Sequence, residues 1–282
     1  MAKIKRKNTR PKISFSMLWQ NLLTFAIAQL LALATAIPLL SEKVYTSYSA
    51  PVPWYYFVVS LAIATMFVIL AIKYLKGGRF FVLVFYFVIV LGAMEVFANY
   101  MTTELAIACA LIILVLRITA PRIWTHNLAI IMGLAGVSAS IGLDLMPLGV
   151  VIILVVLSIY DYIAVYKTKT MVKMFEGMMS RGVIFSIIIP QHAKNWFTDL
   201  KKVKRNEGFM FLGTGDIALP MLFAAACLNI SMISAIAVII GATVGVLAIH
   251  LSLAISAKRA PMPALPPIAL FSILGFLISL YL

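Results

Sequence analysis

Two aspartates inside long apolar stretches are the residues of this chain best suited to chemistry. Asp216 ends the sequence Gly213-Thr214-Gly215-Asp216 near the start of the apolar stretch 209–228, and Asp161 lies in the stretch 147–166. A carboxylate near the centre of a bilayer costs about 2.5 to 3.5 kcal/mol even on the most lenient insertion scales. Because function usually offsets such a cost, the sequence predicts that these two aspartates form one site inside a membrane.

Two neighbouring carboxylates can carry out acid and base catalysis together. Both cannot ionise cheaply, so one proton is shared and the pair titrates as a unit. One carboxylate can then take a proton from water while the other protonates or polarises a carbonyl group. Gly213 and Gly215, which have no side chains, would let a substrate backbone or a neighbouring helix approach closely. As a bare pattern, G-x-G-D is also compatible with ordinary helix packing.

The composition restricts the elements that can position the two aspartates. Hydrophobic residues make up 63% of the chain, charged residues 11%, and the mean hydropathy is +1.08. A soluble domain of this composition would have an apolar surface, and an outer-membrane barrel would alternate polar and apolar residues. The sequence therefore predicts an all-α polytopic membrane protein. Three histidines and the separate cysteines Cys109 and Cys227 form no cluster that indicates a metal, a cofactor or a disulfide.

Nine apolar stretches are predicted to span the membrane. They cover residues 17–40, 54–75, 80–98, 103–116, 128–143, 147–166, 209–228, 232–257 and 262–282. We divide the chain into an N-terminal region of six spans (1–166), a polar loop (167–208) and a C-terminal region of three spans (209–282). The fourth and fifth spans are short for a bilayer of about 30 Å, so the apolar pattern alone does not fix their ends.

The distribution of charge predicts the orientation of these spans. With the N-terminus inside, every basic residue except Lys43 falls on the inner side. This asymmetry follows the positive-inside rule and explains the net charge of +14 without nucleic acid as a partner. The sequence thus predicts an integral protein of the cell membrane whose N-terminus and 167–208 loop are cytoplasmic and whose C-terminus is outside.

The same arrangement places the two aspartates at similar depth. Asp161 lies about 9 Å before the cytoplasmic end of its span, and Asp216 lies about 12 Å into the next one, at 1.5 Å per residue. Adjacent antiparallel helices can bring carboxylates at matched depth together. The last span begins on the same cytoplasmic side with a proline-rich segment, Pro263-Ala264-Leu265-Pro266, in which proline blocks regular helix.

These motifs, in this order, resemble those of the presenilin and signal-peptide-peptidase family of intramembrane aspartyl proteases. The family marks are matched by Tyr160-Asp161, by Gly213-Thr214-Gly215-Asp216 and by Pro263-Ala264-Leu265, and the nine spans and the long loop also agree. Each motif is short, but the ordered set is specific and covers the whole chain.

The resemblance implies an aspartic endopeptidase that cuts peptide bonds within transmembrane helices, with Asp161 and Asp216 as the catalytic pair. It implies substrate contacts from the other motif residues, namely Tyr160, Gly213, Thr214, Gly215, Pro263, Ala264 and Leu265. The partners expected are transmembrane-helix or signal-peptide-like proteins in a lipid bilayer. Because the chain is compact, it resembles a small prokaryotic or archaeal homologue that acts without accessory subunits.

Two other functions stay open on the residues alone. Intramembrane aspartates also relay protons in proton-coupled transporters, although no internal repeat is evident here. A prepilin-peptidase-like membrane protease also uses a G-x-G-D motif, but it gives no reason for Tyr160-Asp161 and Pro263-Ala264-Leu265.

Two further patterns concern packing and substrate. The G-x-x-x-G motif from Gly241 to Gly245 predicts close helix packing, which could serve contacts within the chain or a homo-oligomer; we favour the former. The β-branched stretch 182–190 is too short to span, and the short apolar stretch 209–212 leads into G-x-G-D. We expect one or both to form strands beside the site and to pair with an unwound substrate.

Overall fold

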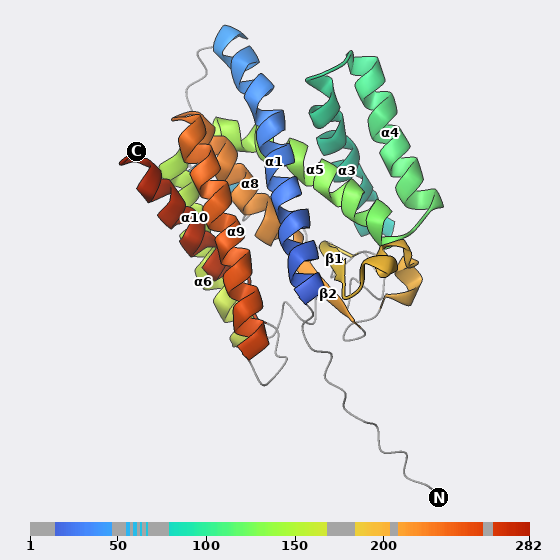
Figure 1. Cartoon of the computed structure of the whole chain (residues 1–282). Helices are drawn as coiled ribbons and strands as arrows, with labels where there is room; N and C mark the ends of the chain where they lie inside the picture. The colour runs from blue at the N-terminus through green and yellow to red at the C-terminus, as the bar shows by residue number, and fades with distance from the viewer. Residues whose placement is uncertain are drawn as a thin grey trace, which may run out of the picture.

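The structure, a computed structural model, describes residues 15–46, 79–167, 184–203, 208–255 and 262–282, together with the helical positions 55, 56, 59, 60, 63 and 66. Eight long helices and two short strands make up these regions (Figure 1). The helices are α1 Phe15–Thr46, α3 Arg79–Ala98, α4 Thr103–Thr119, α5 Ile123–Asp144, α6 Pro147–Tyr166, α8 Thr214–Leu228, α9 Met232–Ile255 and α10 Leu265–Ser279. The strands are β1 Ser186–Pro190 and β2 Phe209–Gly213, separated by two 3-10 turns, Ala193–Phe197 and Leu200–Lys202.

Helix α5 lies at the centre of this bundle. It packs against α3 and α4 on one side and against α1 and α8 on the other, while α6, α9 and α10 surround α8 (Figure 1). Its residues are largely small and buried, including Ala129, Ala135 and Ala139, which lets neighbouring backbones approach in the absence of a strong hydrophobic force between helices. The arrangement places α6, α8 and α10, which carry the three motifs, side by side.

The G-x-x-x-G face of α9 is used within the chain, as expected. A Cβ atom added to Gly241 would lie 2.1 Å from the Phe271 carbonyl oxygen, and one added to Gly245 would lie 2.6 Å from the Ile268 Cα atom. Both contact atoms belong to α10, so the two glycines let α10 lie directly on α9. This packing fixes the start of α10 beside the site.

The two strands form an antiparallel ladder at the end of the bundle where α1 begins (Figure 1). Ile187 pairs with Leu212 and Ile188 with Phe211. The Thr214 N–H donates to the Phe185 carbonyl and the Gln191 N–H to the Gly208 carbonyl. These two bonds define which residue pairs of the ladder are hydrogen-bonded to each other and which are not. Even-numbered residues of β2 therefore turn their peptide groups toward β1, and odd-numbered ones turn them away.

The sheet lies between the helix bundle and the portion of the loop that follows β1. Ile187, Ile189 and Leu212 belong to the main core of the bundle. Ile188 packs on the opposite side with Ile123 and Val203. All five side chains of β1 are buried, so β1 is a buried strand in spite of its position in a polar loop.

Several predicted boundaries were wrong, for identifiable reasons. The predicted span 209–228 is helical only from Thr214, because residues Phe209–Gly213 form the strand that was also expected over 209–212. The predicted span 128–143 begins earlier, at Ile123, since His126 and Asn127 interrupt the apolar stretch yet are buried with polar partners. The helix of the last span begins at Leu265 rather than at 262.

Within the described regions, five helices are long and apolar enough to cross a membrane, and α8 and α10 are shorter apolar helices. The predicted span 54–75 lies mostly outside the described residues, where only the six helical positions named above represent it. The structure thus shows a mostly helical membrane protein, and the count of nine spans stays a prediction.

Candidate active site

Asp161 lies near the end of α6, where its carboxylate meets the start of α10. The side chain is buried, and its Oδ2 atom accepts a hydrogen bond of 3.3 Å from the Leu265 N–H. The first amides of a helix have no partner within it, so they are available to an acceptor. Pro266 and Pro267 follow and have no N–H to offer. The proline-rich segment therefore presents an amide of its own to the first aspartate.

Asp216 lies in the first turn of α8 and is held by the strand that precedes it. The Gly213 N–H donates a hydrogen bond to the Asp216 carboxylate. A Cβ atom at Gly213 would lie 2.9 Å from Asp216 Oδ2, closer than real Cβ atoms come. The absence of a side chain at the first glycine of the motif therefore leaves room for the carboxylate to fold back over the end of β2.

The two carboxylates lie close enough to interact electrostatically. They come from α6 and α8, which pack against each other. Each is buried, with 7% of its surface exposed, so the charge of either one is poorly screened by solvent. Such a pair can hold one shared proton and act as acid and base in a single reaction.

The other motif residues differ in their surroundings. Gly215 is exposed, and a Cβ atom there would find nothing within 4 Å, so space is open beside Asp216. The Thr214 N–H ties α8 to the sheet through Phe185. Pro263 and Ala264 are half-buried and precede Leu265. Tyr160 is 61% exposed, so it lies on the outer face of α6 and not with the buried Asp161.

Gln29 makes a buried polar contact that the sequence motifs did not indicate. Its Nε2 atom donates to the Ile217 carbonyl oxygen at 3.1 Å, one residue after Asp216, and the side chain is fully buried. Pro220 lies inside α8 and cannot donate to the Asp216 carbonyl, which leaves the first turn less constrained. Gln29 therefore braces this turn from α1. A glutamine within an apolar stretch is the signal that could have found it.

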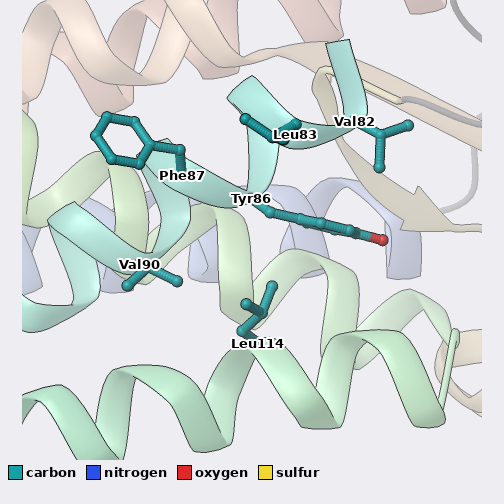
Figure 2. A pocket seen from close by; sticks show the side chains of 6 residues that line it. All are labelled: Val82, Leu83, Tyr86, Phe87, Val90 and Leu114. Atoms are coloured by element: carbon teal, nitrogen blue, oxygen red, sulfur yellow. The ribbon is translucent and has the colours of Figure 1, made fainter. Parts of the chain in front are cut away.

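A hollow elsewhere on the surface offers no comparable chemistry. It has a volume of about 470 Å³ and lies between α3 and α4 (Figure 2). Its lining is apolar apart from the Tyr86 hydroxyl and comprises Val82, Leu83, Tyr86, Phe87, Val90 and Leu114. Among the described residues no three histidines, cysteines or acids group as a metal site would require. The aspartate pair is therefore the candidate active site.

Comparison with known families identifies the chain. A family model described as signal-peptide peptidase, presenilin aspartyl protease matches residues 22–282. The chain belongs to this family. It is an intramembrane aspartyl protease, and the family match favours this function over the proton-coupled transporter and the prepilin-peptidase-like protease that the sequence left open.

Solved structures agree on the fold of this protease. A presenilin family intramembrane aspartate protease crystallised in space group C222 superposes with a TM-score of 0.66 at 19% identity, covering 94% of this chain and 98% of the other. A structure of a presenilin family intramembrane aspartate protease in space group P2 gives a TM-score of 0.64 at 22% identity, covering 95% and 97%. No curated protein sequence matches. The fold is presenilin-like over nearly the whole chain.

Proposed function

We propose that Asp161 and Asp216 are the catalytic pair of this protease. The observation that supports the assignment is that the two buried carboxylates interact while each is held by a backbone amide, one by the Leu265 N–H and the other by the Gly213 N–H. Both carboxylates are thereby oriented by backbone N–H groups, which keep their positions when side chains rotate. Such fixed orientation is what proton transfer in a reaction requires.

The pair accounts for each proton in peptide hydrolysis. The ionised carboxylate removes a proton from water as the water oxygen bonds to the scissile carbonyl carbon. The protonated carboxylate gives its proton to the carbonyl oxygen. When the tetrahedral intermediate collapses, the C–N bond breaks and the leaving nitrogen takes the proton from the carboxylate that removed it from water. The other carboxylate takes a proton from one hydroxyl of the intermediate as the new carboxyl group forms, which restores the single shared proton. No metal or cofactor is needed for this sequence.

The experiment that tests this proposal uses the purified protein in detergent and a synthetic transmembrane-helix peptide. Mass spectrometry should detect two fragments whose masses sum to the peptide plus one water. An intact peptide after long incubation would contradict it.

Substrate contacts are proposed for the rest of the motif residues. The Pro263-Ala264-Leu265 segment forms one wall of the site beside Asp161, and the open space at Gly215 admits a substrate backbone next to Asp216. Thr214 joins α8 to the sheet and so positions the open space at Gly215. Tyr160, on the exposed face of α6, would contact a substrate helix before it unwinds.

An unwound substrate would find its backbone partners at the outer edge of β2. Unwound peptide groups inside a membrane need hydrogen-bond partners. The Gly213 peptide belongs to this edge, and its N–H reaches the Asp216 carboxylate. A substrate strand that paired with this edge by strand addition would therefore run directly past the catalytic pair.

Proline substitutions in β2 can test this outer edge and the edge that pairs with β1 independently. Phe209→Pro removes an N–H on the outer edge, whereas Met210→Pro removes one that faces Ile189. We expect Phe209→Pro to lower kcat/KM about tenfold, as loss of about one hydrogen bond to substrate implies. Its melting temperature should match that of Phe209→Ala, which loses the same packing on the Ile188 cluster but keeps the N–H. Met210→Pro should lower the melting temperature as well. Equal melting temperatures and equal activities for both variants would argue against strand addition at β2.

We also propose the finer topology: nine spans, with the N-terminus and the loop 167–208 in the cytoplasm of a cell-membrane protein. In this arrangement the N-terminal region (1–166) supplies Asp161 and the C-terminal region (209–282) supplies Asp216. The G-x-x-x-G face is occupied by α10, which supports a protease that acts as a single chain without accessory subunits.

Cysteine labelling tests this orientation. In a variant lacking Cys109 and Cys227, new cysteines between positions 41 and 49 should react with an impermeant maleimide in intact cells, because the charge distribution places them outside. A cysteine at Met171 should react only after the membrane is opened. Reversed labelling would mean the inverted orientation, which is the one expected of signal peptide peptidases. The orientation of the substrate would then be reversed as well.

A further inference from the structure

Arg117, near the end of α4, is a buried cation without a carboxylate partner. Only 7% of its surface is exposed, and within the described regions its hydrogen bond goes to a neutral ring, from Nε to the Nδ1 atom of His126 at 3.2 Å. No acid of those regions forms an ion pair with it. A guanidinium keeps its charge inside a protein, and a buried charge is costly unless it is paired. The structure therefore leaves a positive charge for a partner from outside the chain to neutralise.

His126 cannot supply the missing negative charge. Because Arg117 can only donate, the His126 Nδ1 atom is the acceptor and the ring proton lies on Nε2. This Nε2 atom donates to the Ser186 carbonyl oxygen of β1 at 3.1 Å, and the ring stacks on Phe85 with centroids 6.0 Å apart. The neutral imidazole thus holds one edge of the guanidinium in place. The two terminal nitrogens of Arg117 stay available to another acceptor.

The guanidinium lies at one end of the apolar hollow between α3 and α4. Arg117 interacts electrostatically with Tyr86, whose hydroxyl is the polar group in the lining of the hollow. In Figure 2 this hydroxyl points toward the end where Val82 lies. A short turn joins α3 to α4, so the end of α4 lies beside the start of α3 (Figure 1). Leu114, which also lines the hollow, precedes Arg117 by three residues. The hollow therefore has one polar, positively charged end.

The remainder of the hollow suits a hydrocarbon chain. Val82, Tyr86 and Val90 follow one another at intervals of four along α3 and are half-buried, whereas Leu83 and Phe87 are exposed. The helix rises about 12 Å from the first of these residues to the last. The volume of about 470 Å³ lies within the ~300 to 1,000 Å³ typical of sites for small ligands. Because α3 is apolar and long enough to span a membrane, this hollow faces lipid.

We propose that the hollow binds one anionic phospholipid, with the phosphate on the Arg117 guanidinium and the Tyr86 hydroxyl and one acyl chain along α3. Arginine matches a phosphate with two parallel N–H···O bonds. Basic pockets between membrane helices bind anionic head groups in this way. Arg117 directly follows the predicted span 103–116, at the level where a head group lies. The site is separate from the aspartate pair, and the proposal does not depend on the function proposed above.

The test measures the lipid that the full chain retains, by native mass spectrometry after reconstitution in equal amounts of phosphatidylglycerol and phosphatidylcholine. We expect wild type to retain one phosphatidylglycerol. Arg117→Gln should lower the retained fraction about fivefold, the effect of one cation at a membrane surface. Lys194→Gln is the matched control, because it removes an exposed cation from the same end of the protein but not from the hollow. It should retain lipid like wild type.

A second variant guards against misfolding of Arg117→Gln. Val90→Trp keeps the charge and its contact with His126 but fills the hollow, so it should lower lipid retention as well. Added phosphatidylglycerol should raise the melting temperature of wild type and leave that of Val90→Trp unchanged, since a ligand stabilises only a protein that binds it. Inorganic phosphate should shift neither.

Three results would each overturn the proposal. Equal retention by wild type and both hollow variants would mean that lipid surrounds the helices without a specific site. Absence of retained lipid in wild type would mean that the predicted span 54–75 or a second copy of the chain fills the hollow. A shift with inorganic phosphate would mean an anion site that needs no acyl chain. None of these measurements depends on proteolysis, so a failure of the lipid site and a failure of the proposed function are distinguishable.

Discussion

Asp161→Asn and Asp216→Asn are each expected to abolish proteolysis, with a loss of at least about 10²- to 10⁴-fold, the range that general acid–base catalysis contributes. Asparagine has nearly the volume of aspartate and can still accept from the Leu265 or Gly213 N–H. It cannot take up or release a proton in the reaction. The helices should therefore keep their positions while the chemistry stops.

Rates should be measured by quantitative mass spectrometry of peptide fragments, together with the melting temperature of each variant. Glu104→Gln is the matched control, because it neutralises an exposed acid on α4 far from the pair and should cleave like wild type. Substantial cleavage by either purified aspartate variant would remove that residue from the proposed catalytic pair.

Gly213→Ala is expected to lower kcat about 10²-fold, the loss that a misplacement of about 1 Å can cause. The backbone at Gly213 has φ −60° and ψ 144°, which alanine adopts without strain. The new methyl group would instead lie 2.9 Å from Asp216 Oδ2, so the carboxylate has to move. The loss should therefore be in the chemical step and not in stability.

Gly215→Ala provides the contrast within the same motif. Its methyl group would enter open space in the protein and would meet only a bound substrate. We expect KM to rise while kcat stays near wild type, measured with the same peptide over a range of concentrations. If Gly213→Ala and Gly215→Ala changed kcat and KM alike, the glycines would have a common packing role, and Gly213 would have no special role in holding Asp216.

The aspartate variants and the glycine variants both test how this protease holds carboxylates in an apolar environment. Each aspartate receives a backbone amide from a place where regular structure stops: the start of α10 at Leu265, and the end of β2 at Gly213. Free amides are rare inside a membrane because helices use their own. The prolines and glycines of the motifs thus mark places where a backbone N–H is left free to hold the proposed catalytic pair.

The sequence by itself determined the protein class and the residues of the motifs. Both depend on local properties: apolar stretches long enough to span, basic residues confined to one side, and the cost of a carboxylate in lipid. That cost made Asp161 and Asp216 stand out without any knowledge of their neighbours. The short β-branched stretch before the second aspartate likewise predicted β1.

The tertiary structure decided which groups meet. Leu265 lies 104 positions from Asp161, Gln29 lies 188 from Ile217, and Asn127 lies 61 from Ile188. No periodicity in one segment reports on such pairs, because each partner satisfies its polar groups across the bundle. For the same reason the sequence predicted residues 209–212 both as the start of a span and as a strand beside the site; the pairing with β1 decides for the strand and turns the Gly213 amide toward Asp216.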